Sequence, residues 1–127
     1  MNIPQDLYLT EIDLYRFGNA TSPRLDHVRV PRDIPTTPIN GVAFVQPGQH
    51  GISLMTKERA EKTPGTGWVW LIAQGTHLEP GLKIVKDSDT HYFLAPSVLM
   101  PLDEFKGQLA RLAARCKRVW RQNPVAT

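Results

Sequence analysis

Short β-favouring runs separated by turn residues constrain the fold of this chain most. The runs extend over Leu7–Phe17, Gly41–Val45, Gly51–Met55, Trp68–Gln74, Leu82–Lys86 and His91–Ala95. Each is apolar or alternating, and glycine, proline, aspartate or asparagine follows most of them. We expect each run to form a strand. We also expect hairpins across residues 46–50, 75–81 and 87–89, where the turn chemistry is densest.

Two helices are predicted beside these strands. Thr56 is a suitable N-cap for a short helix up to Lys62, which the Pro64–Gly67 segment then stops. A long C-terminal helix begins at Pro101 and should end before Pro124. Its predicted apolar face repeats at spacings of three and four, through Phe105, Leu109, Leu112, Cys116 and Val119. Mostly strands with one long and one short helix predict an α+β fold.

The length of 127 residues suits one domain, and we expect residues 1–127 to form a single unit. The proline-rich stretch 20–40 is expected to be an irregular connection with one short strand at His27–Val30. The single cysteine, Cys116, cannot form an internal disulfide, and we interpret it as a buried free thiol. The four histidines are widely spaced and no metal site is expected.

The N-terminal residues lack the basic and apolar regions of a secretion signal, and no window of the sequence is long and apolar enough to span a membrane. We therefore expect a cytoplasmic protein, and any export should use a route without a cleaved signal. The net charge of +3 is unevenly distributed. Six basic residues and no acidic one lie between Phe105 and Arg121, so the rest of the chain carries −3. This basic stretch could bind an acidic protein or nucleic acid, or it could simply complement the helix dipole.

Three polar residues are candidates for chemistry. Arg16 closes an apolar strand, where a guanidinium can hold a phosphate or carboxylate, although a surface salt bridge is an equally ordinary role. Ser53 follows Gly51, which would let a ligand approach the backbone, but it could also be a hydrogen-bonded core hydroxyl. His91 begins an aromatic strand and could act as acid or base, or serve only as a structural histidine.

The order of these segments resembles a known family. The sequence has Leu14-Tyr15-Arg16, then Gly51–Leu54, then Leu82–Asp87, followed by Thr90–Pro96 and a final helix. In this order the chain is similar to the small ADP-ribosyltransferase-like toxins that the bacterial type VI system secretes. The similarity is strongest from Gly75 to the helix. The proline-rich segment and residues 57–67 match the family pattern poorly.

The resemblance implies a split antiparallel sheet with a cleft for NAD. It assigns Arg16, Ser53 and His91 as catalytic residues. The neighbours expected to contact NAD are Tyr15, Gly51, Thr90 and Tyr92. It further implies a secreted antibacterial effector in bacterial competition, which acts on an unknown macromolecular target in the target-cell cytoplasm and is paired with a cognate immunity protein.

The chain departs from the family pattern in one respect. Many of these transferases use a glutamate on the late strand, and no acid lies between His91 and Pro101. Glu79, in the preceding turn, is the nearest acid and the candidate to substitute for it. The reaction is left open between ADP-ribosyl transfer and NAD hydrolysis. The alternative is a non-catalytic interaction domain whose basic C-terminal helix binds an acidic protein or nucleic acid.

Overall fold

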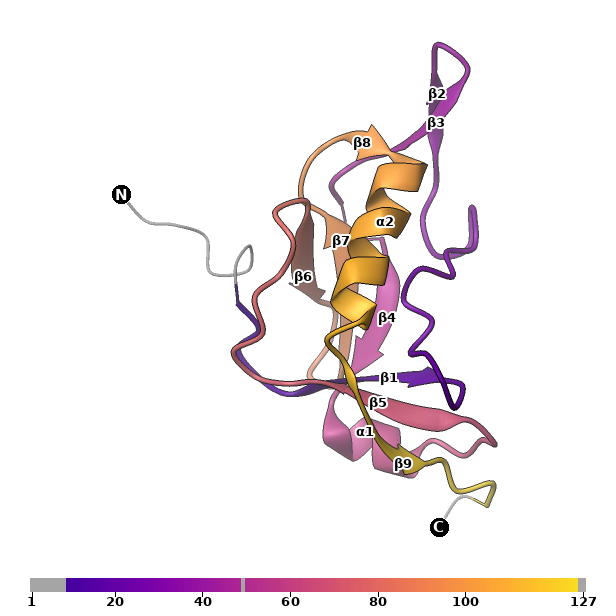
Figure 1. Cartoon of the computed structure of the whole chain (residues 1–127), viewed down its shortest axis with the longest axis vertical. Coiled ribbons are helices and arrows are strands. Elements are labelled where there is room, and N and C mark those ends of the chain that lie inside the picture. The colour runs from indigo at the N-terminus through magenta and orange to yellow at the C-terminus, as the bar shows by residue number, and fades with distance from the viewer. Residues whose placement is uncertain (1–8, 49, 126–127) are drawn as a thin grey trace.

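The computed structural model describes residues 9–48 and 50–125 and has an α+β architecture (Figure 1). In this part of the chain all paired strands are antiparallel. The elements are β1 (Leu14–Gly18), β2 (Thr37–Ile39), β3 (Val42–Val45), β4 (Ile52–Met55), α1 (Lys57–Lys62), β5 (Trp68–Ile72), β6 (Leu82–Lys86), β7 (His91–Pro96), β8 (Met100–Pro101), α2 (Leu102–Ala113) and β9 (Lys117–Arg121). This architecture agrees with the predicted α+β class.

The main sheet has the order β6-β7-β4-β1-β5-β9, and its two halves meet weakly in the middle. Strand β1 is in register with β5 along its whole length, but it pairs with β4 only at Tyr15 and Met55. Figure 1 shows β1, β5 and β9 running across the direction of β4, β6 and β7. The sheet is therefore split between β1 and β4.

Helix α2 covers the half-sheet of β4, β6 and β7. Its residues Phe105, Leu109 and Leu112 are completely buried, at the spacing of three and four that the sequence predicts. They share the larger core with Leu14 and Leu94, among others. This packing fixes the half-sheet that carries two of the three predicted catalytic residues.

A smaller core lies on the other side of β1, against α1. It contains Tyr15, Met55, Ala60 and Val69. Thr56 caps α1 as predicted, since its hydroxyl accepts a hydrogen bond from the Arg59 amide. Each half of the sheet thus has its own helix and its own core.

The predicted hairpin between residues 41–45 and 51–55 is wrong. Strand β3 pairs with β2 and β8, whereas β4 pairs with β1 and β7. The actual hairpin turns at Asn40 and Gly41, which both have positive φ angles of 51° and 79°. Asparagine followed by glycine is the strongest short signal for such a turn, and it outweighs the Pro-Gly pair at residues 47–48.

The C-terminal helix is shorter than predicted and ends at Ala113. Cys116 and Val119 are not on it, because residues 117–121 form β9 at the open edge of β5. The helical spacing continues past the helix by coincidence. Pairing with β5 and packing of Trp120 beside Tyr15 stabilise the strand instead.

The first strand is also shorter than predicted, because it begins at Leu14, while Leu7 and Tyr8 lie outside the described residues. Residues 27–30 form no strand. Residues 75–81 form no hairpin, since β5 and β6 belong to different halves of the sheet. The hairpin across residues 87–89 is confirmed by the pairing of β6 with β7.

Candidate functional site

Arg16 lies on β1 at the split in the sheet. Side chains alternate along the strand, so Tyr15 and Phe17 enter the smaller core while Arg16 shares the opposite face with Leu14. Its Nη1 donates a hydrogen bond of 3.1 Å to the main-chain oxygen of Ser53 on β4. Arg16 therefore bridges the two halves of the sheet where direct strand pairing stops.

The Arg16 guanidinium is partly desolvated. Burial lowers its pKa, and the positive charges of Arg29 and Arg24 lower that pKa further, whereas Asp33 raises it. Arginine keeps its charge under such conditions. The buried Nε of Arg16 has no hydrogen-bond partner among the described residues. Buried polar atoms are usually satisfied, so this atom marks a position where a bound group would be favourable.

Ser53 and His91 come from neighbouring strands and lie on the same face. Ser53 is in register with Phe93, and Met55 is in register with His91. Because alternate residues share a face, the side chains of Ser53, Phe93 and His91 are neighbours on β4 and β7. The His91 ring contacts the Phe93 ring edge-on, with centroids 4.7 Å apart.

Arg16, Ser53 and His91 thus occupy three adjacent strands but not one face. Tyr15 is in register with Met55 and so shares the face of Ser53 and His91, whereas Arg16 lies on the opposite face and reaches Ser53 at its main-chain oxygen. Among the described residues no hydrogen bond joins His91 to either of the others.

Asp87 is a site residue that the sequence analysis missed. Its Oδ2 lies 3.0 Å from Nδ1 of His91, across the β6–β7 turn. The His91 side chain is 16% exposed and that of Asp87 is 53% exposed. A carboxylate at Nδ1 fixes the ring orientation and favours the tautomer with the proton on Nδ1, which leaves Nε2 as an acceptor. Asp87 and His91 are four residues apart across a predicted hairpin, and this spacing could have indicated that their side chains meet.

The four predicted NAD contacts do not converge. The ring of Tyr15 is buried in the smaller core, 5.4 Å from that of Trp120. Tyr92 follows His91 directly and therefore projects from the opposite face of β7. Thr90 interacts with α1, through Arg59 Nη1 at 3.5 Å. These three side chains point in different directions.

Gly51 is required by close packing of the backbone. A Cβ atom added at this position would lie 1.9 Å from the main-chain oxygen of Leu94 on β7. No other residue could be accommodated without shifting one of the two strands. The close approach is between two strands, so in this structure Gly51 serves the packing of β4 against β7.

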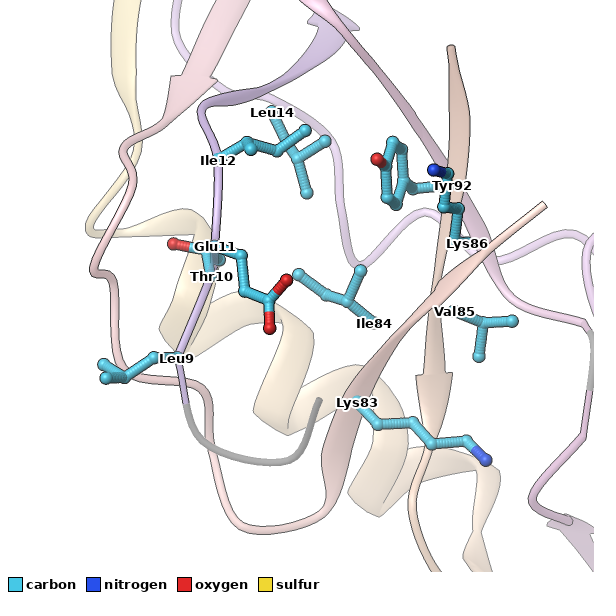
Figure 2. Close-up of a pocket in the computed structure, with 10 residues that line it drawn as sticks. All are labelled: Leu9, Thr10, Glu11, Ile12, Leu14, Lys83, Ile84, Val85, Lys86 and Tyr92. Atoms are coloured by element: carbon cyan, nitrogen blue, oxygen red, sulfur yellow. The ribbon is translucent and has the colours of Figure 1, made fainter. Parts of the chain in front are cut away.

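One cavity lies near the N-terminal end of β1, where Leu14 lines it. It has a volume of about 430 Å³ and lies between residues 9–12 and β6. Figure 2 shows Leu14 and Tyr92 above Ile84, with the Glu11 carboxylate beside Ile84. Arg16, Ser53 and His91 do not line this cavity. Its lining is mixed, with the charged side chains of Glu11, Lys83 and Lys86 beside apolar ones.

A second cavity of about 360 Å³ does include Arg16. It lies at the end of β1, where the chain enters the proline-rich connection. Its lining is basic and consists of Arg16, Phe17, Gly18, Asn19, Arg24, His27 and Arg29. A cavity of this size and charge suits an anionic group.

Glu79 is engaged elsewhere. Its carboxylate forms an ion pair with Arg115 and lies 4.0 Å from Arg111. Arg115 also donates to the main-chain oxygen of His77 at 2.6 Å. These contacts attach the β5–β6 connection to the C-terminal end of α2. Glu79 is thus a structural ion-pair partner in this arrangement, and the suggestion that it replaces the late-strand glutamate gains no support.

Residues 9–48 and 50–125 contain neither a metal-binding cluster nor a membrane-spanning helix. No group of three or more histidine, cysteine, aspartate or glutamate side chains could hold a metal ion. Neither helix in these ranges has the length and apolar character that crossing a bilayer requires.

Comparison with known proteins gives one family. A family model described as the Tse2 ADP-ribosyltransferase toxin matches residues 8–119, a range that includes all three predicted catalytic residues, Asp87 and the basic cavity. No curated protein and no solved structure matches the chain. The family match covers most of the sequence and agrees with the resemblance seen in its motifs. The chain therefore belongs to the Tse2 ADP-ribosyltransferase toxin family.

Proposed function

We propose that this toxin binds NAD at the split between the half-sheets and breaks the bond between nicotinamide and ribose. The observation that carries the proposal is the hydrogen bond from Arg16 to the Ser53 main-chain oxygen, which holds a cation at the split where the pairing of β1 with β4 stops. Ser53 and His91 lie beside each other on the other face of the neighbouring strands β4 and β7. Family membership supports ADP-ribosyl transfer as the chemistry and NAD as its substrate.

Each proposed catalytic residue has a role that suits its position. Arg16 is the cation that binds a phosphate of NAD through its guanidinium group. Ser53 forms the wall beside the nicotinamide ribose. His91, oriented by Asp87, accepts a hydrogen bond from a ribose hydroxyl through Nε2. Departure of nicotinamide leaves a cationic sugar, which the carboxylate of Asp87 can help to stabilise through His91.

The two candidate reactions differ in the group that accepts ADP-ribose. In transfer the ADP-ribosyl group forms a bond to a nucleophile of a macromolecule, and in hydrolysis water takes that place. Incubation of the purified protein with adenylate-labelled NAD and a bacterial lysate separates the two. Label in macromolecules indicates transfer, and free ADP-ribose alone indicates hydrolysis.

The biological setting forms a second part of the proposal. We propose delivery by a type VI system into the cytoplasm of a competing bacterium, and neutralisation by a cognate immunity protein. Family membership supports this setting. Co-expression of a small protein encoded beside the toxin gene should restore growth, and failure of every adjacent gene to do so would contradict the pairing.

Inducible expression in a bacterium tests the catalytic proposal. Wild-type protein should arrest growth and lower cellular NAD, whereas Arg16→Ala and His91→Ala should do neither. Arg32→Ala is the matched control, because Arg32 is exposed and lines none of the cavities described above. Each variant is purified and melted to show that it is folded. A folded Arg16→Ala protein with full toxicity would refute the site.

The alternative of a basic helix that binds an acidic partner is not favoured. Helix α2 ends at Ala113, so Arg115, Lys117 and Arg118 do not extend its surface. Arg115 pairs with Glu79, and Arg118 stacks 4.4 Å above the ring of Trp68. These contacts account for two of the cations that the alternative requires.

A further inference from the structure

The basic cavity at the end of β1 has features that the proposed catalytic residues do not explain. Only Arg16 comes from the predicted site. The other cations, Arg24 and Arg29, come from the connection between β1 and β2, which the sequence analysis treated as irregular. Two arginines from a loop and one from a strand thus line one cavity.

The loop that supplies these arginines is held in place at its start. Its first turn is closed by Asn19, whose side-chain oxygen accepts hydrogen bonds from the Thr21 and Ser22 amides at 2.9 and 2.8 Å. The Trp70 indole donates to the main-chain oxygen of Asn19 at 2.8 Å. Arg118 donates to the main-chain oxygen of Ala20 at 2.6 Å. The start of the loop, residues 19–22, is therefore anchored to β5 and β9, and Arg24 follows it closely in sequence.

The cavity carries an excess of positive charge. Three guanidinium groups line it, and Asp33 is the acid that compensates them, through an ion pair of 2.9 Å with Arg29. Three positive charges and one negative charge leave a net charge of two. Arg24 makes no side-chain hydrogen bond or ion pair with the described residues. An anion with two negative charges would balance the cavity.

We propose that this cavity binds the diphosphate group of a nucleotide, with Arg24 and Arg29 as binding residues beside Arg16. A diphosphate diester carries two negative charges at neutral pH and offers several oxygens to guanidinium forks. In the proposed function that diphosphate belongs to NAD, and to this extent the inference rests on it.

Calorimetric titration of the purified full chain tests the proposal without turnover. The probes are ADP-ribose, inorganic pyrophosphate, inorganic phosphate and adenosine. ADP-ribose and pyrophosphate should bind, with an affinity that falls as salt rises, while adenosine should not. The deciding comparison is ADP-ribose against inorganic phosphate, because the diphosphate diester of ADP-ribose carries two charges and adenosine controls for its nucleoside. Tighter binding of ADP-ribose than of phosphate would identify the diphosphate as the ligand, and equal binding would refute that assignment.

Variants locate the binding site. Arg24→Gln combined with Arg29→Gln should weaken pyrophosphate binding at least about tenfold, and Arg32→Gln in the same loop should not. Because Arg29→Gln also removes the Asp33 ion pair, Arg24→Gln alone is the second test and should weaken binding about threefold or more. Unchanged binding in a folded double variant, or no pyrophosphate binding by the wild type, would overturn the proposal.

The outcomes separate this inference from the proposed function. Pyrophosphate binding that depends on Arg24, in a protein that consumes no NAD, would support the diphosphate site and refute NAD cleavage. NAD consumption with an unchanged KM in the variant that combines Arg24→Gln with Arg29→Gln would support NAD cleavage and refute the diphosphate site.

Discussion

His91 is held by contacts on two sides of its ring. Asp87 lies 3.0 Å from Nδ1 and the Phe93 ring meets it edge-on. If His91 contacts a ribose hydroxyl, Asp87 is a positioning residue that keeps Nε2 directed at the substrate. We predict that Asp87→Asn lowers kcat for NAD consumption about tenfold or more with little change in KM, since acid or base groups in the correct state contribute at least that much.

Asp89 provides the matched control for this substitution. It lies in the same turn, its side chain is 99% exposed, and its ion pair with Lys86 is long at 3.5 Å. Asp89→Asn should therefore leave both kcat and KM unchanged. Equal losses in the two variants would show that the turn, rather than the Asp87–His91 contact, is what matters.

Cys116 is a partly buried thiol just beyond α2. Burial raises its pKa from 9.0 to about 11, although the charge of Arg115 opposes the change. At pH 8 the folded protein should therefore contain about a hundredfold less thiolate than an ordinary cysteine, and alkylation by iodoacetamide should be slower in proportion. Timed mass spectrometry with and without denaturant measures this. Equal rates in both states would contradict the burial.

The same shift predicts a dependence of stability on pH. The thiol ionises in the unfolded chain near pH 9 and in the folded chain near pH 11. Between these two values the unfolded chain loses the thiol proton before the folded chain does. The contribution of the neutral buried thiol to the free energy of unfolding is therefore fully present below pH 9 and declines as pH rises toward 11. The stability difference between the wild type and Cys116→Ser should change over this window and stay constant below it.

Glu79 connects two elements rather than serving the site. Its ion pairs with Arg115 and Arg111 attach the β5–β6 connection to the end of α2. We predict that Glu79→Gln lowers the free energy of unfolding by about 1 kcal/mol, as for other partly exposed pairs, and leaves NAD consumption unchanged. Chemical denaturation and an NAD assay on the same sample measure both. Loss of NAD consumption in a Glu79→Gln protein of normal stability would contradict this prediction and show that Glu79 takes part in the reaction.

Local sequence patterns predict individual strands and the start of a helix, whereas pairing between distant strands determines where helix α2 ends. Strand β6 and helix α1 follow from alternation and from the Thr56 cap, which act within a few residues. The end of α2 could not be predicted in this way, since Cys116 and Val119 continue the helical spacing by coincidence. What overrides that spacing is the open edge of β5, which is distant in sequence.

The candidate site shows the same division. The positions of Arg16, Ser53 and His91 in the chain suggest a shared site, and the register of β1, β4 and β7 brings them onto adjacent strands. The sequence does not predict that Tyr15 and Tyr92 point away from a shared site. Tyr15 packs into the smaller core and Tyr92 against the larger one, and the positions of these cores depend on contacts between distant parts of the chain. Arg24 and Arg29 were missed because they lie in a loop without periodicity.

Across the whole molecule, the two half-sheets behave as two packed units with a narrow junction. One is packed under α2 and the other against α1, and they meet at the Tyr15–Met55 pair and the Arg16–Ser53 hydrogen bond. Functional groups at such a junction are positioned by both cores at once.

The basic C-terminal stretch gives a test at this scale. Lys106, Lys117 and Arg121 belong to it but form no ion pair within the described residues. We predict that changing all three to glutamine leaves growth inhibition and NAD depletion as in the wild type, because the proposed site lies around Arg16 and does not use them. Arg16→Ala, measured in parallel, should abolish both. The opposite pattern, with toxicity lost in the triple variant and kept in Arg16→Ala, would mean that the protein acts by binding an acidic partner or nucleic acid through its basic surface.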